Sequence, residues 1–305
     1  MNKSNISFII PAYNCDDTIE ESVDSIFNGN FEDGDEVIIV DDASTDDTSK
    51  IITRLKKKYS QVISFRHQIN KGTAAAGRNT AIQISKNDLL FTLDSDNILI
   101  SGSIKKLKEY LLLNNADAVA FSELWFFKND INNITQKWLF QKEITAQNCL
   151  AGHITPCPTG NYLFTKSSWK KAGTYFEPTI VNQTLDSWTF GIRQLFSGSK
   201  MITLENTYYL HRAGINSHWV RENKKGNVTM SALIAVMPFL DKIIDEDIDY
   251  MLSKEGRFTW FDNLKTKPIR LRGEKISENT SRIIKLEKNS KIVYKIKAFL
   301  RKLIK

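Results

Sequence analysis

The sequence predicts an α/β protein with a mostly parallel sheet flanked by helices, followed by a mainly helical C-terminal extension. Early in the chain, short apolar runs alternate with amphipathic runs of about a dozen residues. Such alternation is typical of parallel sheets, because a helix carries the chain back to the edge where the next strand starts. From Asn216 onward the apolar spacing is mostly helical. We therefore expect a domain over 1–215, with halves of about 1–115 and 116–215, and an extension over 216–305.

The first half is expected to hold four strand–helix units. Each strand is a short apolar run bounded by polar residues, and these runs lie at 7–10, 37–40, 62–66 and 89–93. The helices carry apolar residues three or four positions apart, and they are expected at 19–27, 51–58, 74–85 and 101–112. Three lysines end the second helix, where positive charge interacts favourably with the helix dipole.

The second half alternates less regularly. Its expected strands are 118–124, 162–165, 201–204 and 207–210, and its expected helical segments are 167–172 and 185–196. Gly173 ends the first of these helical segments, since glycine tolerates the left-handed conformation that often follows a helix. The stretch 126–150 is mixed, with Trp138 and Phe140 as expected core anchors.

Charge is unevenly distributed along the chain. The net charge is +7, yet Arg282 to Lys305 alone holds nine Lys/Arg and one Glu, a net of +8. The remainder has 33 basic and 34 acidic residues, so the folded body is near neutral. Because the basic residues gather in a tail, the composition argues against a nucleic-acid-binding fold.

The cysteines and the N-terminus suggest a cytoplasmic protein. Cys15, Cys149 and Cys157 are odd in number and lack metal-ligand spacing, which favours reduced thiols. The N-terminal residues lack the apolar region of a signal peptide. The longest strongly apolar stretch, 231–240, is too short to cross a bilayer.

Two carboxylates follow the strand expected at 89–93. Residues i and i+2 of an extended segment share a side, so Asp94 and Asp96 are expected to face one point beyond the strand. Open parallel sheets bind ligands there. Hard oxygen donors suit Mg²⁺ or Mn²⁺. The alternative is a solvated acidic turn that caps the next helix.

The loop after the first strand, Pro11-Ala12-Tyr13-Asn14, contains no glycine. The chain therefore lacks a dinucleotide-binding glycine motif there, and no P-loop motif occurs elsewhere. A nucleotide would need another anchor for its phosphates, and a metal bridging the diphosphate is the obvious one.

Four segments, in order, resemble family 2 glycosyltransferases of GT-A fold. They are Ser7 to Asn14, Val37 to Asp46, Asn70-Lys71-Gly72 through Gly77-Arg78-Asn79, and Asp94-Ser95-Asp96. The resemblance covers roughly residues 5–215. It implies an inverting hexosyltransferase of the bacterial polysaccharide-biosynthesis type, which uses a nucleotide-diphospho-sugar.

The resemblance also implies a donor site. Its residues are Pro11, Ala12, Tyr13, Asn14, Asp41, Asp42, Lys71, Arg78, Asp94, Ser95 and Asp96. Pro11, Tyr13 and Asp42 would surround the base and ribose, and Arg78 would lie near the base or diphosphate. Asp96 corresponds to the main ligand of Mn²⁺ or Mg²⁺, with Asp94 on the ribose or the metal. An Asx turn for Asp42 and an exposed helix charge for Arg78 are the structural alternatives.

Two later residues complete the expected chemistry. Asp186 occupies the place of the family's catalytic base, although the chain has Leu-Asp where the family often has Glu-Asp. Its alternative is a first-turn acid that the helix dipole stabilises. His211 could complete the metal shell, but His211-Arg212 departs from the family's His-x-Arg spacing, and a structural histidine is the alternative.

Acceptor contacts are expected from the second half of the domain. The candidates are His153, Thr159, Gly160, Asn161 and Trp188. Trp188 could stack on a sugar ring or simply pack its helix, since buried tryptophan is common.

The expected reaction is a single displacement that moves a sugar, in the first instance from a UDP-sugar, to a saccharide or lipid-linked saccharide. Asp186 would take the acceptor proton, and the metal would neutralise the leaving diphosphate. One alternative is a non-catalytic nucleotide- or carbohydrate-binding relative. The other is a sugar-nucleotide nucleotidyltransferase, which normally has a glycine- and arginine-rich first loop.

The tail is expected to form a basic amphipathic helix. Between Lys291 and Lys305, apolar residues follow helical spacing and basic residues fill most other positions. Such a helix suits an anionic membrane surface, which would make the protein peripheral on the inner face of the cytoplasmic membrane. Docking of the helix on the protein's own body or on a second subunit is the alternative.

Overall fold

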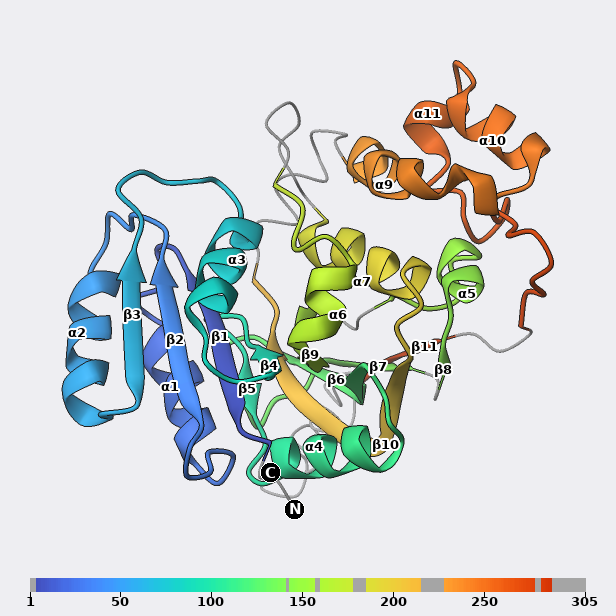
Figure 1. Cartoon of the computed structure of the whole chain (residues 1–305). Helices are drawn as coiled ribbons and strands as arrows, with labels where there is room; N and C mark the ends of the chain where they lie inside the picture. The colour runs from blue at the N-terminus through green and yellow to red at the C-terminus, as the bar shows by residue number, and fades with distance from the viewer. Residues whose placement is uncertain are drawn as a thin grey trace, which may run out of the picture.

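The computed structural model describes residues 4–140, 143–156, 160–177, 185–214, 228–277 and 281–286. Over these residues one sheet runs through the molecule with helices on both faces, and further helices lie beyond it (Figure 1). The expected α/β architecture is confirmed.

The first half forms a parallel sheet with its helices. Its strands are β1 (Ile6–Ala12), β2 (Glu36–Asp41), β3 (Val62–Arg66), β4 (Leu89–Thr92) and the short β5 (Ile98–Leu99). Its helices are α1 (Ile19–Phe27), α2 (Thr48–Lys58), α3 (Ala74–Ile84) and α4 (Ser103–Leu113). The order β4-β1-β2-β3 is parallel throughout, so the carboxyl ends of these strands meet at one edge.

The second half extends the sheet with mixed pairing. Its strands are β6 (Ala118–Phe127), β7 (Gln136–Leu139), β8 (Glu143–Ile144), β9 (Tyr162–Thr165) and β10 (Met201–Arg212). Its helices are α5 (Ala146–Leu150), α6 (Lys166–Lys171) and α7 (Asp186–Phe196). Strand β9 lies antiparallel between β4 and β6, whereas β10 runs parallel to β6. This arrangement brings the loops of both halves together.

Strand β10 corrects one expectation. The two strands expected at 201–204 and 207–210 are a single strand whose register against β6 shifts between Leu204 and Tyr208. Asn206 has a φ of 59°, in the left-handed region that asparagine tolerates. The polar residues at this irregularity read as a turn in the sequence, but they only bend a continuous strand.

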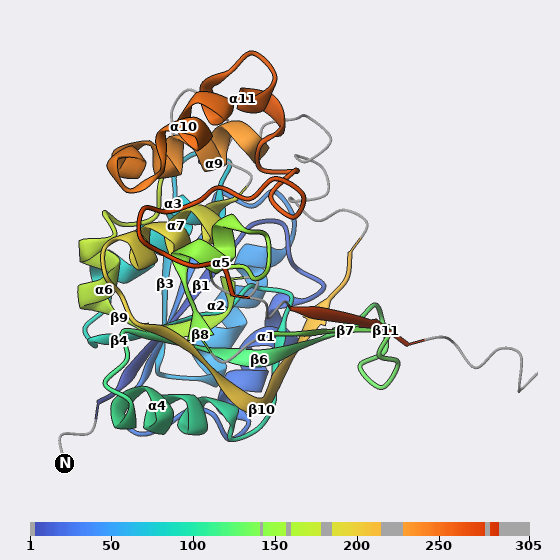
Figure 2. The same ribbon diagram turned by 90° about the vertical axis from the view of Figure 1, so that its right-hand side faces the viewer.

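The C-terminal segment is helical before it returns to the sheet. It comprises α9 (Val228–Val236), η2 (Met237–Lys242), α10 (Asp245–Leu252), α11 (Gly256–Thr259) and β11 (Arg282–Lys285). The helices lie on the α7 side of the sheet, and β11 pairs antiparallel with β7 at the sheet's outer edge (Figure 2). Strand β11 was not expected from the sequence. The basic helix expected between Lys291 and Lys305 lies outside the described residues.

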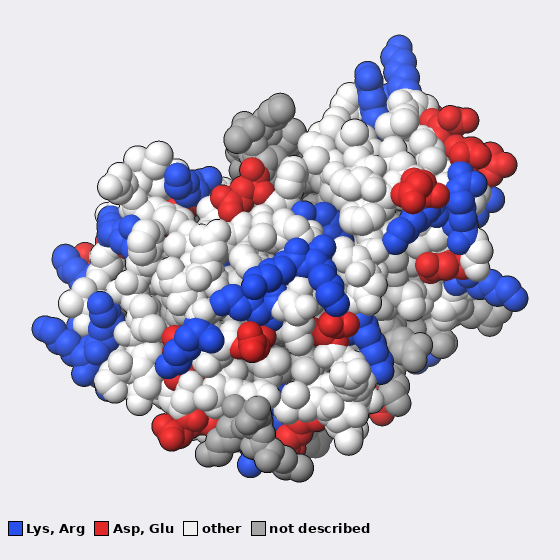
Figure 3. Space-filling model, viewed as in Figure 1, with Lys and Arg blue, Asp and Glu red and all other residues white. Residues whose placement is uncertain are grey.

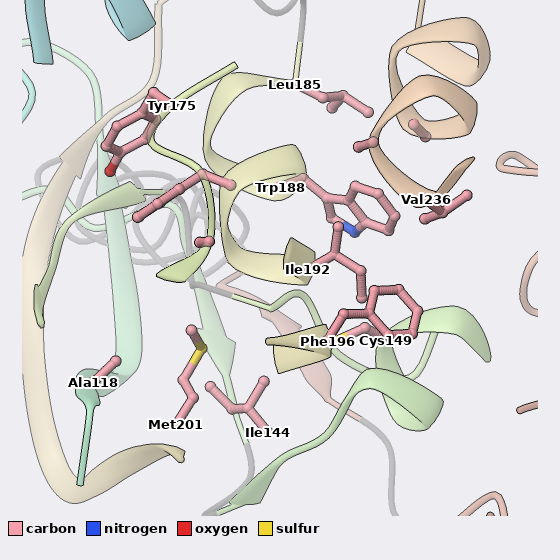
Figure 4. Close-up of a cluster of buried hydrophobic side chains, with 14 of the residues drawn as sticks. Ala118, Ile144, Cys149, Tyr175, Leu185, Trp188, Ile192, Phe196, Met201 and Val236 are labelled. Carbon is pink, nitrogen blue, oxygen red and sulfur yellow. The ribbon is translucent and has the colours of Figure 1, made fainter. Parts of the chain in front are cut away.

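Alternate residues of the central strands divide the core between the two faces. Ile9 of β1 belongs to the cluster under α3 and α7, whereas its neighbours Phe8 and Ile10 belong to the cluster under α1, α2 and α4. Figure 4 shows Trp188 and Ile192 projecting from α7 toward α9, where Val236 meets them. This packing fixes α7, the helix that begins at Asp186.

A glycine allows α3 to approach β1 closely. A Cβ at Gly77 would lie 3.1 Å from the Cβ of Pro11, which is tighter than ordinary van der Waals contact. The next residue of α3 is Arg78, so this close approach brings its side chain to the carboxyl edge of the sheet.

The surface charge is not evenly spread over the body. Lys and Arg side chains gather in a band across the middle of one face (Figure 3), over α6, whose last turn carries Lys170 and Lys171. Among the described residues, no helix has both the length and the apolar character needed to cross a membrane.

Two of the three cysteines lie in the described residues, and both are free thiols. Cys149 is buried in the core. Burial raises the pKa of Cys15 to about 11, so its thiol is a poor nucleophile at neutral pH.

Candidate active site

The loops after β1 and β2 are joined at the carboxyl edge of the sheet. The backbone N–H of Asn14 donates to Ser44 Oγ at 3.1 Å, and that of Thr45 donates to Asn14 Oδ1 at 2.8 Å. Tyr13 in the same loop is 46% exposed, so its ring is free to contact a ligand. Ala12 is buried and pairs with Asp41 at the strand ends.

The carboxylates of Asp41 and Asp42 are both occupied by protein partners. Asp41 accepts a hydrogen bond from the Ser44 N–H at 2.8 Å and pairs with Arg66 at 2.7 Å. Asp42 Oδ1 lies 2.6 Å from His67 Nδ1, and both its oxygens are 3.0 Å from the backbone nitrogen of Lys71. Asp42 is therefore more than an Asx turn, because it ties together the loops after β2 and β3. The Lys71 side chain is exposed.

The sequence reasoning missed His67. Its ring is buried, with Nε2 3.0 Å from Thr80 Oγ1 of α3. The available signal was the strand register, since Arg66 pairs with Asp41 and the next residues, His67 and Asp42, must then be neighbours.

Asn161 holds Asp94 through two hydrogen bonds. The backbone N–H of Asp94 donates to Asn161 Oδ1 at 2.7 Å, and Asn161 Nδ2 donates back to Asp94 Oδ2 at 2.9 Å. Asn161 is fully buried, so in this structure it supports Asp94 and does not face an open acceptor site. The neighbouring Ser95 is partly exposed.

The surroundings of Asp96 disfavour its charged form. Burial raises the pKa of Asp96 to about 7, with a further contribution from Asp94, and Arg212 offsets only part of this. Asp96, whose charge is disfavoured by burial and by a neighbouring carboxylate, offers a hard oxygen donor next to that of Asp94, and such a pair fits a divalent cation such as Mg²⁺ or Mn²⁺.

His211 is half-buried beside this pair, and its ring nitrogen Nδ1 is buried. Burial lowers its pKa to about 4, and Asp94 acts in the opposite direction, so the imidazole is neutral. Its Nδ1 has no hydrogen-bond partner among the described residues, which is compatible with a metal ligand. However, no group of three or more His, Cys, Asp or Glu side chains within the described ranges is arranged to hold a metal. The two carboxylates are therefore the part of the site that fits a cation.

Arg78 joins the two ends of the site. Its side chain is 3% exposed, with Nη2 2.6 Å from Asp94 Oδ1 and Nη1 paired with Asp186 Oδ2. Burial alone would lower the pKa of Arg78, but Asp186 and Asp94 raise it above its usual value. Arg78 is thus a charged, buried bridge between the expected metal pair and the expected base. The exposed helix charge considered as its alternative is wrong.

The remaining acceptor-side candidates have structural contacts. The Gly160 carbonyl accepts from Thr92 Oγ1 at 2.5 Å, and the His153 carbonyl accepts from the Ser281 N–H at 2.8 Å. Trp188 is 8% exposed and packs edge-on against Phe261 at 4.9 Å, so the structure displays its packing role. Thr159 lies outside the described residues.

The fold is shared with the solved structure of another protein. TarS 1–349 of S. aureus, in complex with UDP-GlcNAc, matches with a TM-score of 0.62 at 16% sequence identity, covering 85% of this chain and 72% of that chain. At this identity the likeness shows the fold, and the expected GT-A fold is confirmed.

Two curated relatives align with part of the chain. Poly(ribitol-phosphate) beta-glucosyltransferase of Bacillus spizizenii is 37% identical over 113 residues, which are 37% of this chain and 18% of the relative. UDP-Glc:alpha-D-GlcNAc-diphosphoundecaprenol beta-1,3-glucosyltransferase WfaP of Escherichia coli is 41% identical over 99 residues, which are 32% of this chain and 38% of the relative. The chain thus spans well under half the length of these relatives.

The family model described as Glycosyl transferase family 2 matches residues 7–173, which is more than half of the chain. The match includes the loops after β1, β2 and β4 and the Gly77-Arg78-Asn79 segment of α3. The chain therefore belongs to glycosyl transferase family 2.

Proposed function

We propose that the protein transfers a sugar from a UDP-sugar to a hydroxyl of a saccharide or lipid-linked saccharide, with inversion at the anomeric carbon. The observation that carries the proposal is the bridge of Arg78 between Asp94 and Asp186. It brings a carboxylate of the donor motif and a carboxylate at the start of α7 to the two terminal nitrogens of one guanidinium. A donor and an acceptor that met there would have a metal-binding pair on one side and a base on the other.

The proposed mechanism assigns one step to each group. Asp186 accepts the proton of the acceptor hydroxyl as that oxygen attacks the anomeric carbon from the face opposite the nucleotide. Asp96 and Asp94 would hold Mn²⁺ or Mg²⁺, which supplies positive charge to the departing diphosphate. A single displacement turns an α-linked nucleotide sugar into a β-glycoside and requires no second nucleophilic carboxylate.

The donor and acceptor classes rest on the relatives. UDP-Glc and a diphosphoundecaprenol-linked saccharide are named for WfaP, and poly(ribitol phosphate) for the Bacillus enzyme. These names support a UDP-sugar donor and a polymeric or lipid-linked acceptor. An acceptor of that kind is consistent with the basic tail, through which we propose attachment to the inner face of the cytoplasmic membrane.

Release of UDP from UDP-sugars in the presence of Mn²⁺, with and without saccharide acceptors, tests the proposal. We expect slow hydrolysis of the cognate donor alone and faster release when an acceptor is present. Tight UDP-sugar binding without any turnover would instead identify a non-catalytic relative. Formation of a UDP-sugar from UTP and a sugar phosphate would identify a nucleotidyltransferase.

A further inference from the structure

Both terminal nitrogens of Arg78 are already engaged by carboxylates. Nη2 is 2.6 Å from Asp94 Oδ1, and Nη1 pairs with Asp186 Oδ2. The third donor, Nε, is buried and has no hydrogen-bond partner among the described residues. With 3% of its side chain exposed, Arg78 presents almost no surface to a phosphate in the crevice.

The two carboxylates differ in what else holds them. Asp94 is also bound by Asn161, at 2.7 Å through its backbone N–H and at 2.9 Å through its side chain. For the Asp186 carboxylate, Arg78 is the hydrogen-bond partner that the described part of the chain provides. Asp186 begins α7, and that helix start has no side-chain cap. The orientation of Asp186 therefore depends on Arg78, whereas that of Asp94 does not.

The neighbours of Arg78 make the guanidinium a rigid support. Gly77 lets α3 lie close against β1, as described above. Asn79 accepts the Tyr175 N–H at 2.9 Å and donates to the Tyr175 carbonyl at 2.8 Å. The guanidinium carbon lies 5.4 Å from the centre of the Tyr175 ring. A buried guanidinium flanked by an aromatic face and two carboxylates has few other positions available.

We propose that Arg78 is a positioning residue for the base, holding the Asp186 carboxylate toward the donor motif, and is not a ligand of the donor's diphosphate. This inference rests on the proposed function. It differs from the role implied by the family resemblance, in which Arg78 lies near the donor's base or diphosphate. The three residues Gly77, Arg78 and Asn79 then have separate roles, which are close approach of the helix, orientation of the base, and attachment of the segment at Tyr175.

The test compares Arg78→Lys, Asp186→Asn and the double variant in steady-state transfer and in UDP calorimetry with Mn²⁺. A lysine keeps the charge but cannot bridge two carboxylates as a fork does. We expect Arg78→Lys to lower kcat at least tenfold while the Kd for UDP changes less than threefold. The double variant should be no slower than Asp186→Asn, because residues that act as a unit are not additive.

Arg193→Lys is the matched control. Arg193 belongs to the same helix as Asp186 but donates to the backbone carbonyls of Thr189 and Thr174. Its kcat should stay within about twofold of wild type, a small effect as expected for a residue outside the site. Far-UV circular dichroism reports folding for every variant independently of UDP binding, and Arg78→Gln serves as a second probe if the lysine variant does not fold.

The outcomes separate this inference from the proposed function. A Kd for UDP raised tenfold or more in Arg78→Lys, with kcat little changed, would make Arg78 a diphosphate ligand and overturn the inference. So would defects that multiply in the double variant. If Asp186→Asn is as active as wild type, the proposed base is wrong. If the wild-type protein transfers no sugar, the proposed function fails and this inference fails with it.

Discussion

Asp96 is the residue on which metal-dependent donor binding is proposed to rest. We expect Asp96→Ala to weaken UDP binding in the presence of Mn²⁺ by at least about tenfold, or about 1.4 kcal/mol, without unfolding the protein. The reason is that burial and Asp94 disfavour the charged form of Asp96 in the absence of a cation. A bound cation would therefore interact most favourably with this carboxylate. Calorimetry with UDP, with and without Mn²⁺, measures the effect.

Asp249→Ala, at an exposed aspartate of α10, is the control for the Asp96 variant and should bind UDP as the wild type does. Unchanged UDP affinity in Asp96→Ala would leave Asp94-Ser95-Asp96 as a helix-capping turn.

For Asp186 the predicted effect is on turnover and not on donor binding. Asp186→Asn should bind the donor normally but lose about 10²-fold or more in kcat, because a general base acts in the transition state more than in the ground state. Single-turnover transfer and UDP calorimetry on the same preparation separate the two effects. Near-normal turnover would transfer the role of base to another carboxylate.

At the residue scale, motifs predicted which side chains gather but not what they bind. The pair Asp94 and Asp96 was predicted to converge, and Asp94 does raise the pKa of Asp96. The predicted reason was wrong, because β4 ends at Thr92 and the pair lies in the turn that follows, not in an extended segment. The partners of Asp42 were not, because His67 carries no motif and is recognised only once β2 and β3 are in register. The bridge from Arg78 to Asp186 spans more than a hundred residues of sequence, and only the folded chain reveals it.

At the scale of elements, α7 depends on its packing against the C-terminal helices. Trp188 is buried and meets Phe261 edge-on, so Trp188→Ala should lower the free energy of unfolding by about 3–5 kcal/mol. Trp188→Phe should cost less, because it keeps an aromatic ring in the pocket. Urea denaturation measures both changes. Wild-type stability combined with a raised KM for the acceptor would instead assign Trp188 to sugar stacking.

Elements with a strong period were predictable, and those made by tertiary pairing were not. The expected β3 at 62–66 and β9 at 162–165 have the bounds that the structure gives. Strands β5 and β8 are two residues long and have no period to detect. Strand β11 consists of four exposed residues, two of them basic, and it is a strand because β7 offers an unpaired edge. Its sequence alone reads as part of a charged tail.

At the scale of the whole molecule, the basic tail leads to a testable expectation. We expect Lys297→Glu combined with Arg301→Glu and Lys302→Glu to abolish co-sedimentation with anionic vesicles at low salt, since each basic residue near such a surface contributes about 1 kcal/mol. Transfer to a soluble acceptor should be unaffected.

The control for this experiment comes from the basic band of Figure 3. Lys170→Glu with Lys171→Glu reverses exposed charge on α6 and should leave vesicle binding intact. Loss of vesicle binding in this control, with normal binding of the tail variant, would move the membrane contact from the tail to α6. If the wild-type protein does not co-sediment with anionic vesicles, neither the tail nor α6 binds a membrane.

The position of β11 also determines which margin of the sheet the C-terminal tail leaves from. In the order β11-β7-β6-β9-β4-β1-β2-β3, the last described residue of the chain, Leu286, directly follows the strand at one margin, and β3, on the side of the nucleotide loops, lies at the other. Seven inter-strand steps of about 4.8 Å separate the two margins by about 34 Å. If the chain beyond Leu286 attaches to a membrane, as proposed, the attachment begins next to β11 and β7, at the margin of the sheet far from β3. The margin at β3, on the side of the nucleotide loops, would then lie away from the membrane and be accessible to UDP-sugars in solution.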